Sequence, residues 1–379
     1  MSPADRVNLP YAALSRRGFF AGVAATAIGA SLSGCRWASD DKVLNVYSWS
    51  DYIAPDTISK FEAATGIMVR YDVYDSNETL DAKLSVGSTG YDVVIPSAMP
   101  FLARQIRSGR FRELDKSLLP NLKGLDSKVL EDLNVADPGN RYGVPYLMAA
   151  TGIGVNRTKV EQLAPGTDLT TLGLLFDPVK LAKLKRCGVS VLDAPVEVLP
   201  AALSYLGRDP KSLSAADLEA AGQAVRAARA NYRYVHSSSY INDLASGEIC
   251  VAQGWVGDLV QARSRANEAG RGVEIEIVLP KEGASFNVDM MAIPKDAPHV
   301  ANAYAFIDFI LQPQVIGAIT NAVGYANAVP ASKAYVDKAI TSDPAIYPPA
   351  GSKLYIPPLP DRDYERARNR LWTEIRGGV

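Results

Sequence analysis

The sequence predicts an α/β protein of two lobes, each built on a mostly parallel sheet flanked by helices. Three observations support this: strand and helix signals alternate, the alternation restarts once, and glycine or proline separates successive elements. Such alternation is typical of parallel sheets with helices on both faces. About 345 residues follow Cys35, which is enough for two lobes of this kind.

The first series of elements begins with a strand at 44–47. Pro55 then starts a helix that presents Ile58 and Phe61 on one face, and Gly66 ends it. The elements that follow are a strand at 67–73, a helix at 77–84, a strand at 91–95 and a helix at 101–108.

The second series repeats this pattern in the middle of the chain. Ligands of such sheets bind beyond the carboxyl ends of the strands, and between two lobes that place is the cleft. The predicted elements are strands at 189–192, 232–235 and 249–253 and helices at 197–206, 218–230 and 259–269.

The first 35 residues read as an export signal. Ser15-Arg16-Arg17-Gly18-Phe19-Phe20 opens an apolar run that closes on Leu32-Ser33-Gly34-Cys35. The paired arginines resemble a twin-arginine signal, and the last four residues resemble a lipobox, whose cysteine becomes a lipidated first residue. A membrane-spanning helix is the alternative, but the run is shorter than the about 20 residues that a span needs. We therefore expect a periplasmic domain, lipid-anchored at Cys35, with residues 36–42 as a tether.

Composition and motifs exclude several functions. The chain has 40 Lys+Arg and 41 Asp+Glu, so no basic surface for nucleic acid is expected. His236 and His299 are its only histidines, and no metal-ligand spacing or Gly-x-Ser-x-Gly elbow occurs. We expect neither an enzyme nor a cofactor or metal. With Cys35 lipidated, Cys187 and Cys250 remain as a disulfide in an oxidising compartment or as two buried thiols.

Several predicted strands are followed by an aromatic residue beside a carboxylate, as in Trp49-Ser50-Asp51-Tyr52 and Trp255-Val256-Gly257-Asp258. A buried carboxylate needs a charged donor, an ammonium supplies one, and an aromatic face attracts the cation. Carboxylates at both ends of an aromatic box would favour a diamine over a monoamine. Each residue also has a structural alternative, such as a core tryptophan or an aspartate that caps a helix.

Longer motifs resemble the polyamine-binding proteins of bacterial ABC importers, and most closely the putrescine-binding members. The similarity covers essentially the whole mature chain. Its motifs are Trp49-Ser50-Asp51-Tyr52-Ile53-Ala54-Pro55-Asp56-Thr57, Tyr71-Asp72-Val73-Tyr74-Asp75-Ser76-Asn77-Glu78, Gly87-Ser88-Thr89-Gly90-Tyr91-Asp92-Val93-Val94-Ile95-Pro96-Ser97, Ala150-Thr151-Gly152-Ile153-Gly154, Tyr240-Ile241-Asn242-Asp243-Leu244, Gly254-Trp255-Val256-Gly257-Asp258 and Gly324-Tyr325-Ala326-Asn327-Ala328.

The resemblance implies a two-lobed periplasmic binding protein fold of type II, with a ligand cleft between lobes. It further implies a monomer that delivers putrescine or a related polyamine to a permease, and a disulfide between Cys187 and Cys250. The implied lobes are 43–149 plus about 277–328, and 150–276 plus about 329–379, with crossings near 149–151 and 275–278. The implied ligand contacts are Trp49, Ser50, Asp51, Tyr52, Ser97, Glu197, Trp255, Asp258, Asp289 and Tyr325.

Roles follow from the same resemblance. Asp289 with Ser50 is expected to receive one ammonium, and Asp258 with Glu197 the other. One position departs from the family, which has a large aromatic residue where this chain has Asn287. Phe286 is one residue away, but such a shift turns a strand side chain to the other face. The departure leaves open the choice among putrescine, cadaverine, agmatine and spermidine, and also a different cationic metabolite. A sensor that signals to a membrane receptor stays open as well, because no motif in the sequence marks a docking surface.

Overall fold

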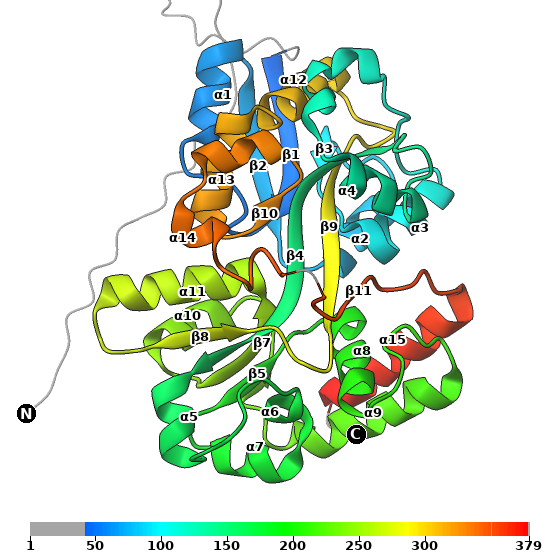
Figure 1. Ribbon diagram of the computed structural model, residues 1–379. Coiled ribbons are helices and arrows are strands. Elements are labelled where there is room, and N and C mark those ends of the chain that lie inside the picture. Colours follow the sequence, from blue (N-terminus) through cyan, green and yellow to red (C-terminus); the bar gives the residue numbers. More distant parts are fainter. Residues whose placement is uncertain (1–41, 350, 378–379) are drawn as a thin grey trace, which may run out of the picture. The chain divides into compact units, whose positions relative to one another are not determined.

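The computed structural model describes residues 42–349 and 351–377. The export signal, Cys35 and the tether up to residue 41 lie outside the described residues. The strands are β1 (Val43–Trp49), β2 (Met68–Tyr74), β3 (Val93–Val94), β4 (Gly143–Asn156), β5 (Val189–Val191), β6 (Tyr234–Val235), β7 (Val251–Trp255), β8 (Ile275–Val278), β9 (Ala284–Ala292), β10 (Ala326–Asn327) and β11 (Leu354–Tyr355) (Figure 1).

These strands form one mixed sheet in the order β2-β1-β3-β9-β4-β7-β5-β6, with β8 and β10 on β4 and β11 on β9. Pairing is parallel at both ends of the sheet, as predicted, where β1 joins β2 and β3 and where β5 joins β6 and β7. The middle differs from the predicted mostly parallel sheets, because β4 runs antiparallel to β9, β7 and β8.

Strand β4 belongs to both halves of the sheet. Its first part pairs with β9 as far as Ala150, and its second part pairs with β7 from Thr151 onward. Strand β8, where the resemblance implies a second crossing, pairs with 153–156 in the second part of β4. The strand that returns to the first half is β9, which pairs with Gly143–Ala150.

Two hydrophobic cores lie on either side of this crossing. The first core takes its buried side chains from 44–147 and 288–329, and the second takes them from 153–275 and 371–375. Trp255 is partly buried and packs against both cores. The two cores thus meet at the strands where the sequence predicts the ligand site.

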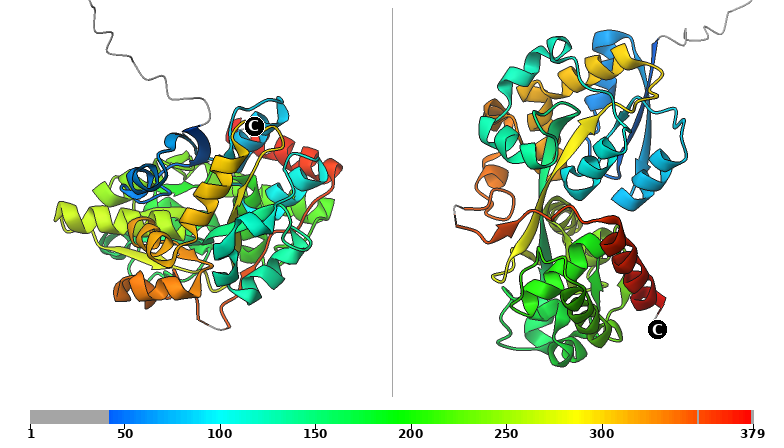
Figure 2. Two further views of the ribbon diagram at one scale, coloured as in Figure 1. Left: turned by 90° about the horizontal axis from the view of Figure 1, so that it is seen from above. Right: turned by 90° about the vertical axis from the view of Figure 1, so that its right-hand side faces the viewer.

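Helices cover the sheet in both halves (Figure 2). The C-terminal helix packs on the second core, where Leu371 approaches Gly222 so closely that a Cβ on that glycine would lie 2.8 Å from the leucine side chain. The helices are α1 (Thr57–Thr65), α2 (Asn77–Ser85), α3 (Ala103–Arg107), α4 (Ser127–Asp132), α5 (Arg157–Leu163), α6 (Gly173–Phe176), α7 (Pro178–Leu184), α8 (Pro195–Tyr205), α9 (Ala215–Arg229), α10 (Tyr240–Ser246), α11 (Val256–Ala269), α12 (Val300–Ile310), α13 (Pro313–Val323), α14 (Lys338–Thr341) and α15 (Arg362–Gly377).

Local signals explain where several helices begin and end. Helix α1 ends at Gly66, which adopts φ 68°, a left-handed conformation that glycine reaches at little cost. Helix α9 begins earlier than predicted because Ser214 caps it, accepting a hydrogen bond from the Asp217 N–H at 3.1 Å. In the described part of the chain no single helix is long and apolar enough to cross a membrane; α12 and α13 meet that test only together, across a 76° bend.

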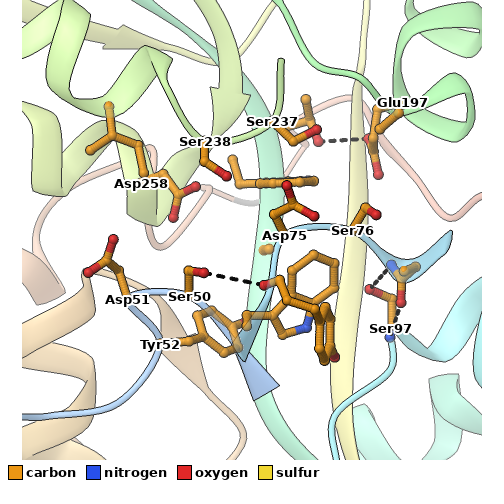
Figure 3. A pocket seen from close by; sticks show the side chains of 18 of the residues that line it. Ser50, Asp51, Tyr52, Asp75, Ser76, Ser97, Glu197, Ser237, Ser238 and Asp258 are labelled. Carbon is orange, nitrogen blue, oxygen red and sulfur yellow. Dashed lines mark hydrogen bonds between the residues drawn. The ribbon is translucent and has the colours of Figure 1, made fainter. Parts of the chain in front are cut away.

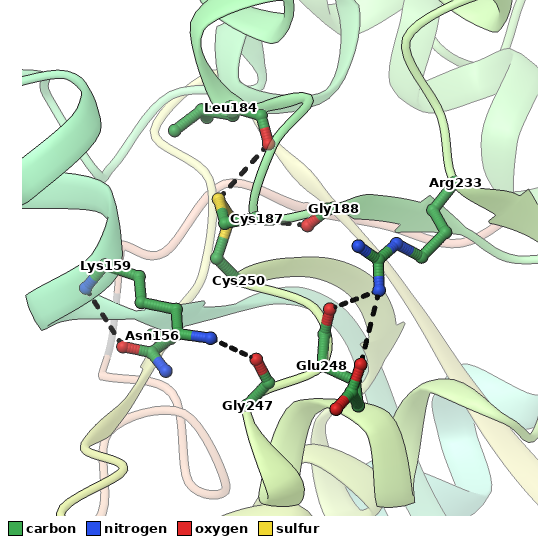
Figure 4. The surroundings of a disulfide bond; sticks show 9 residues. All are labelled: Asn156, Lys159, Leu184, Cys187, Gly188, Arg233, Gly247, Glu248 and Cys250. Carbon is green, nitrogen blue, oxygen red and sulfur yellow. Dashed lines mark hydrogen bonds and ion pairs between the residues drawn. A yellow bond between two sulfur atoms is a disulfide. The ribbon is translucent and has the colours of Figure 1, made fainter.

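The predicted disulfide between Cys187 and Cys250 is present (Figure 4). The two Cα atoms are 5.4 Å apart, and both side chains are buried. The bond joins the residues that precede β5 and β7, and the Cys250 N–H also donates to the Gly188 carbonyl at 2.9 Å. The bridge therefore closes a loop of the second core that spans 63 residues of sequence.

Candidate ligand-binding site

One cavity of about 390 Å³ collects all the residues predicted to contact the ligand (Figure 3). It takes side chains from both cores, and several of them follow directly on the end of a strand. The predicted residues that line it are Trp49, Ser50, Asp51, Tyr52, Ser97, Glu197, Trp255, Asp258, Asp289 and Tyr325.

Asp289 forms one end of the cavity and is almost fully buried. The Ser97 hydroxyl donates to its Oδ1 and the Tyr52 hydroxyl to its Oδ2, both at 2.5 Å. Ser97 is itself held by Asn77, whose Nδ2 donates to the Ser97 hydroxyl at 2.9 Å. Burial raises the pKa of Asp289 to about 6, although the two hydroxyl donors act in the opposite direction.

Asp258 forms the other end, in the first turn of α11. Tyr240 donates to its Oδ2 at 2.7 Å and Tyr325 to its Oδ1 at 2.8 Å. Burial raises the pKa of Asp258 to about 6 against these two phenols, and Asp51 raises it further while Arg265 lowers it. The Tyr325 ring lies over Gly257, where a Cβ would come within 2.1 Å of it, so the close approach requires glycine.

Glu197 contributes a third buried carboxylate. The Thr151 hydroxyl donates to its Oε2 at 2.7 Å. Burial raises the pKa of Glu197 to about 7, and the charges of Glu78 and Asp289 add to this effect. Thr151 lies on β4, where it pairs with Trp255 of β7, so this hydrogen bond ties Glu197 to the strand that the two halves of the sheet share.

The expected roles of the helper groups at the two ends stay predictions. Glu197, expected to help Asp258, has its pKa raised by the charges of Glu78 and Asp289. Ser50, expected to help Asp289, lies next to Asp51, and its hydroxyl donates to the Tyr74 carbonyl at 3.5 Å (Figure 3). Asp51 and Arg265, which lie 3.6 Å from one another, act on the pKa of Asp258.

Aromatic rings form the walls between the two carboxylates. The rings of Trp49 and Trp255 meet edge to face, with centroids 5.5 Å apart, and those of Tyr52 and Tyr325 are 5.0 Å apart. The Trp49 indole N–H donates to the Ile95 carbonyl at 2.8 Å, which fixes the orientation of the ring. These contacts give an apolar box with one carboxylate at each end.

Asn287 has a structural partner instead of an exposed amide. Its Oδ1 accepts the Met99 N–H at 3.2 Å, and its Nδ2 donates to the Met99 carbonyl. Phe286 does not take the place of an aromatic wall, because it lines an apolar cavity of about 330 Å³ that Asn287 separates from the ligand cavity. Because side chains alternate along β9, Phe286 and Asn287 point to opposite faces, and Phe286 does not fill the position of the family's aromatic residue.

Several residues of the cavity were missed from sequence. The turn after β2 supplies Asp75 and Ser76, with Glu78 in the first turn of α2, and the turn after β6 supplies 237–239. Both turns follow predicted strands, so the strand-end rule could have found them. Tyr240 was missed for another reason, since it supports Asp258 from behind without lining the cavity.

Comparisons with known proteins agree with this geometry. A family model described as bacterial extracellular solute-binding protein matches residues 56–348. The putrescine-binding periplasmic protein SpuD of Pseudomonas aeruginosa is 48% identical over 358 residues, which cover 93% of this chain and 97% of that protein. The putrescine-binding periplasmic protein PotF of Escherichia coli is 47% identical over 345 residues, covering 90% and 93%. The solved TpPotD lipoprotein of Treponema pallidum has a TM-score of 0.74 and 28% identity, covering 88% of this chain and 99% of that one.

Proposed function

The chain belongs to the bacterial extracellular solute-binding proteins, and we propose that it captures a polyamine, putrescine above all, for an ABC importer. The observation that carries this proposal is the pair of buried carboxylates, Asp258 and Asp289, at opposite ends of an aromatic box. Each accepts two hydroxyl hydrogen bonds, which fix its orientation, and neither forms an ion pair with a side chain in the described part of the chain. A linear diamine supplies one ammonium to each.

Selectivity for a diamine over a monoamine follows from the free-energy cost of a buried carboxylate that has no charged donor. A monoamine would leave one buried carboxylate without a charged donor, and such a group is costly. A diamine satisfies both ends with charge-assisted hydrogen bonds, while its methylenes pack against the indoles of Trp49 and Trp255. The two relatives at 47–48% identity are named as putrescine-binding, which supports the same choice.

The place of action follows from the relatives and from the start of the chain. Both putrescine-binding relatives are named as periplasmic, and we place this chain in the periplasm as well. We propose that Cys35 carries a lipid anchor and that the arginine pair directs export by the twin-arginine route. The TpPotD relative is itself named a lipoprotein, which supports an anchored form. A monomer with residues 36–42 as its tether would stay within reach of a membrane permease.

Capture is proposed to involve closure of two lobes. We assign 43–149 plus about 277–328 to the first lobe and 150–276 to the second. The pairing of β9 with the first part of β4 supports a return to the first lobe in this segment. The last segment, 329–379, is assigned to the second lobe through α15, which packs on its core. Bending of β4 and β9 would then open and close the cavity.

A thermal-shift panel tests the ligand class. Purified protein is heated with putrescine, cadaverine, agmatine, spermidine, spermine, lysine or arginine, and calorimetry then gives the affinities. Ligand at one hundred times its dissociation constant adds about 2.7 kcal/mol of stability, so putrescine should raise the melting temperature clearly and the amino acids should not. No response to any polyamine would overturn the proposal, whereas a response to agmatine alone would change the ligand within it.

Two further measurements separate capture from its alternatives. Recovery of unchanged putrescine after prolonged incubation with the protein is expected for a binding protein and not for an enzyme. Uptake of labelled putrescine by cells should fall when the gene is removed and return when it is restored. Unchanged uptake, together with normal binding, would favour a sensor.

A further inference from the structure

The start of β1 lies at the edge of the first half of the sheet that is opposite the ligand cavity, at the top of Figure 1. Trp49 ends the strand at the cavity, and the exposed Lys42 precedes its other end. At about 3.3 Å per residue, the 7 residues of β1 place this edge about 20 Å from the cavity. The first turn of α12 lies at the same edge, because the Asn302 side chain donates to the Val43 carbonyl at 2.8 Å.

The chain that leaves β9 also reaches this edge. Strand β9 is antiparallel to β3, and β3 is parallel to β1, so β9 ends where β1 begins. The residues after β9 pair with the segment after α3. There the Arg112 N–H donates to the Ile293 carbonyl at 2.9 Å, and the Lys295 N–H donates to the Arg110 carbonyl at 2.8 Å. The two segments therefore form a short two-stranded surface at the edge.

Four cations gather on this surface, and we call them the basic edge: Arg107, Arg110, Arg112 and Lys295. Phe111 is buried, and side chains alternate along an extended chain, so Arg110 and Arg112 point away from the core. Arg107, Arg112 and Lys295 are exposed, and Arg110 is half-buried. The four charges consequently face solvent together.

The basic edge has no acid of its own to neutralise it. None of its members forms an ion pair within residues 42–349 and 351–377. Glu113, the next residue after Arg112, is bound by Arg141, whose Nε donates to it at 2.7 Å. Asp296 accepts the Thr89 backbone N–H at 2.8 Å and supplies a single negative charge beside the four positive ones. The edge therefore carries a surplus of positive charge.

The length of the chain before β1 limits what this edge can meet. Lys42 follows Cys35 by seven residues, and a chain of that length spans at most about 25 Å. With a lipid on Cys35, Lys42 is held within this distance of the bilayer, and every other described residue is connected to the anchor through it. Anionic headgroups attract basic side chains over about one Debye length, which is about 10 Å at 0.1 M salt.

A second group of exposed cations has similar charge but a different position. Lys183, Lys185 and Arg186 lie at the end of α7, and we call them the α7 cations. They form no ion pair among the described residues either. Helix α7 packs on the second core through Leu181 and Leu184, so these cations belong to the half of the sheet that the tether does not enter. They offer a control that is matched in charge and exposure.

We propose that the basic edge is a membrane-contact surface, which binds the anionic headgroups of the bilayer that holds the Cys35 lipid. The inference goes beyond ligand capture and rests on the proposed lipid anchor. A lipid and a basic patch are two attachments, and two together hold a protein on a membrane more firmly than either alone. The start of β1 would face the bilayer, with the ligand cavity about 20 Å farther along the strand.

Protection of a thiol at this edge tests the proposal on the full chain, processed in cells and placed in lipid vesicles. Ser108 is exposed and lies within the basic edge, so Ser108→Cys introduces a thiol there. A bulky uncharged polyethylene glycol maleimide should label it about tenfold or more slowly on vesicles with phosphatidylglycerol than on phosphatidylcholine alone. In 1 M salt, where charges interact over about 3 Å, the two rates should become equal.

A charge-neutral edge should lose this protection. Arg107→Gln, Arg112→Gln and Lys295→Gln together, in the Ser108→Cys protein, should bring the ratio of the two rates close to one. The ratio cancels any change in the intrinsic reactivity of the thiol. Putrescine affinity should stay that of the wild type, because none of these residues lines the ligand cavity, and this checks that the variant is folded.

The α7 cations provide the control. Lys183→Gln, Lys185→Gln and Arg186→Gln together should leave the protection unchanged. Equal labelling on both lipids before any charge is removed, or the same loss of protection in this control, would overturn the inference. Absence of a lipid on Cys35 by mass spectrometry would overturn it too and leave putrescine binding untouched. Failure of the unaltered protein to bind any polyamine would remove the proposed ligand function, while the protection would still stand.

Discussion

The two ends of the ligand cavity hold their carboxylates in the same way but surround them differently. Asp289 and Asp258 each accept two hydroxyl hydrogen bonds, from Ser97 and Tyr52 at one end and from Tyr240 and Tyr325 at the other. The hydroxyls fix the direction of each carboxylate. The neighbours set the local charge, with a cation beside Asp258 and further acids beside Asp289. The residues that orient the two carboxylates are thus different from the residues that set the charge around them.

The largest effects should come from neutralising either end. Asp258→Asn and Asp289→Asn should each cost about 2 kcal/mol or more of putrescine affinity, because each leaves one ammonium in the cavity without its charged partner. Calorimetry at neutral pH measures the loss. Asp363→Asn, on the exposed start of α15, is the matched control and should bind as the wild type does. Wild-type affinity in both cavity variants would show that the Asp258 and Asp289 carboxylates do not bind the ligand.

Lower pH should weaken binding and reveal the difference between the ends. In the ligand-free protein the pKa of Glu197 is raised to about 7 and that of Asp289 and of Asp258 to about 6. An ammonium favours the ionised forms, so putrescine affinity should fall as the pH drops below about 7, and binding should release protons. Titrations in buffers of different ionisation enthalpy measure that release.

The carboxyl groups at the Asp289 end should set the pH at which putrescine affinity begins to fall. Glu197→Gln removes the group with the higher pKa, so the fall in affinity should then begin nearer pH 6. Without ligand, the three carboxyls have folded-state pKa values above their unfolded values, so their contribution to stability is present at low pH and declines as the pH rises from about 4 through 7. An onset that does not move in the variant would contradict the assignment of Glu197 to this end.

The smallest effect should come from Asp51. This residue has φ 53°, a conformation that asparagine tolerates, so Asp51→Asn changes charge with little backbone strain. Its ion pair with Arg265 is 3.6 Å long and half-exposed, and such pairs contribute about 0–1 kcal/mol. Putrescine affinity should therefore change by no more than this amount, as calorimetry can measure. A loss as large as that of Asp258→Asn would mean that Asp51 contacts the ligand directly.

The sequence was most informative where one residue decides the local structure. Gly66 and the apolar face of Phe61 identify α1, and the aromatic–acid pairs after strands identify residues that the structure gathers around one cavity. Strands β4 and β9 were missed as elements. Strand β4 is buried on nearly all of its residues and so lacks the alternation that marks a half-exposed strand.

The hydrogen-bond partner of Glu197 could not be predicted from sequence. Glu197 on α8 and Asp258 on α11 line one cavity because the fold brings these two helices to it. Thr151 on β4 decides the position of Glu197 through one hydrogen bond. Such choices depend on contacts between residues far apart in the chain, and no local pattern contains them.

Strands β4 and β9 carry cavity residues while they also join the two halves of the sheet. Anyone redesigning the ligand preference of this protein should therefore treat the two kinds of position differently. A change at Asn287 or Thr151 affects a connecting strand as well as the cavity wall. A measured change in affinity would then combine altered ligand contacts with altered bending of that strand. Glu78 and Asp258 lie on helices, so a change there alters the cavity without altering the connecting strands. They are the better starting points for a biosensor with altered specificity.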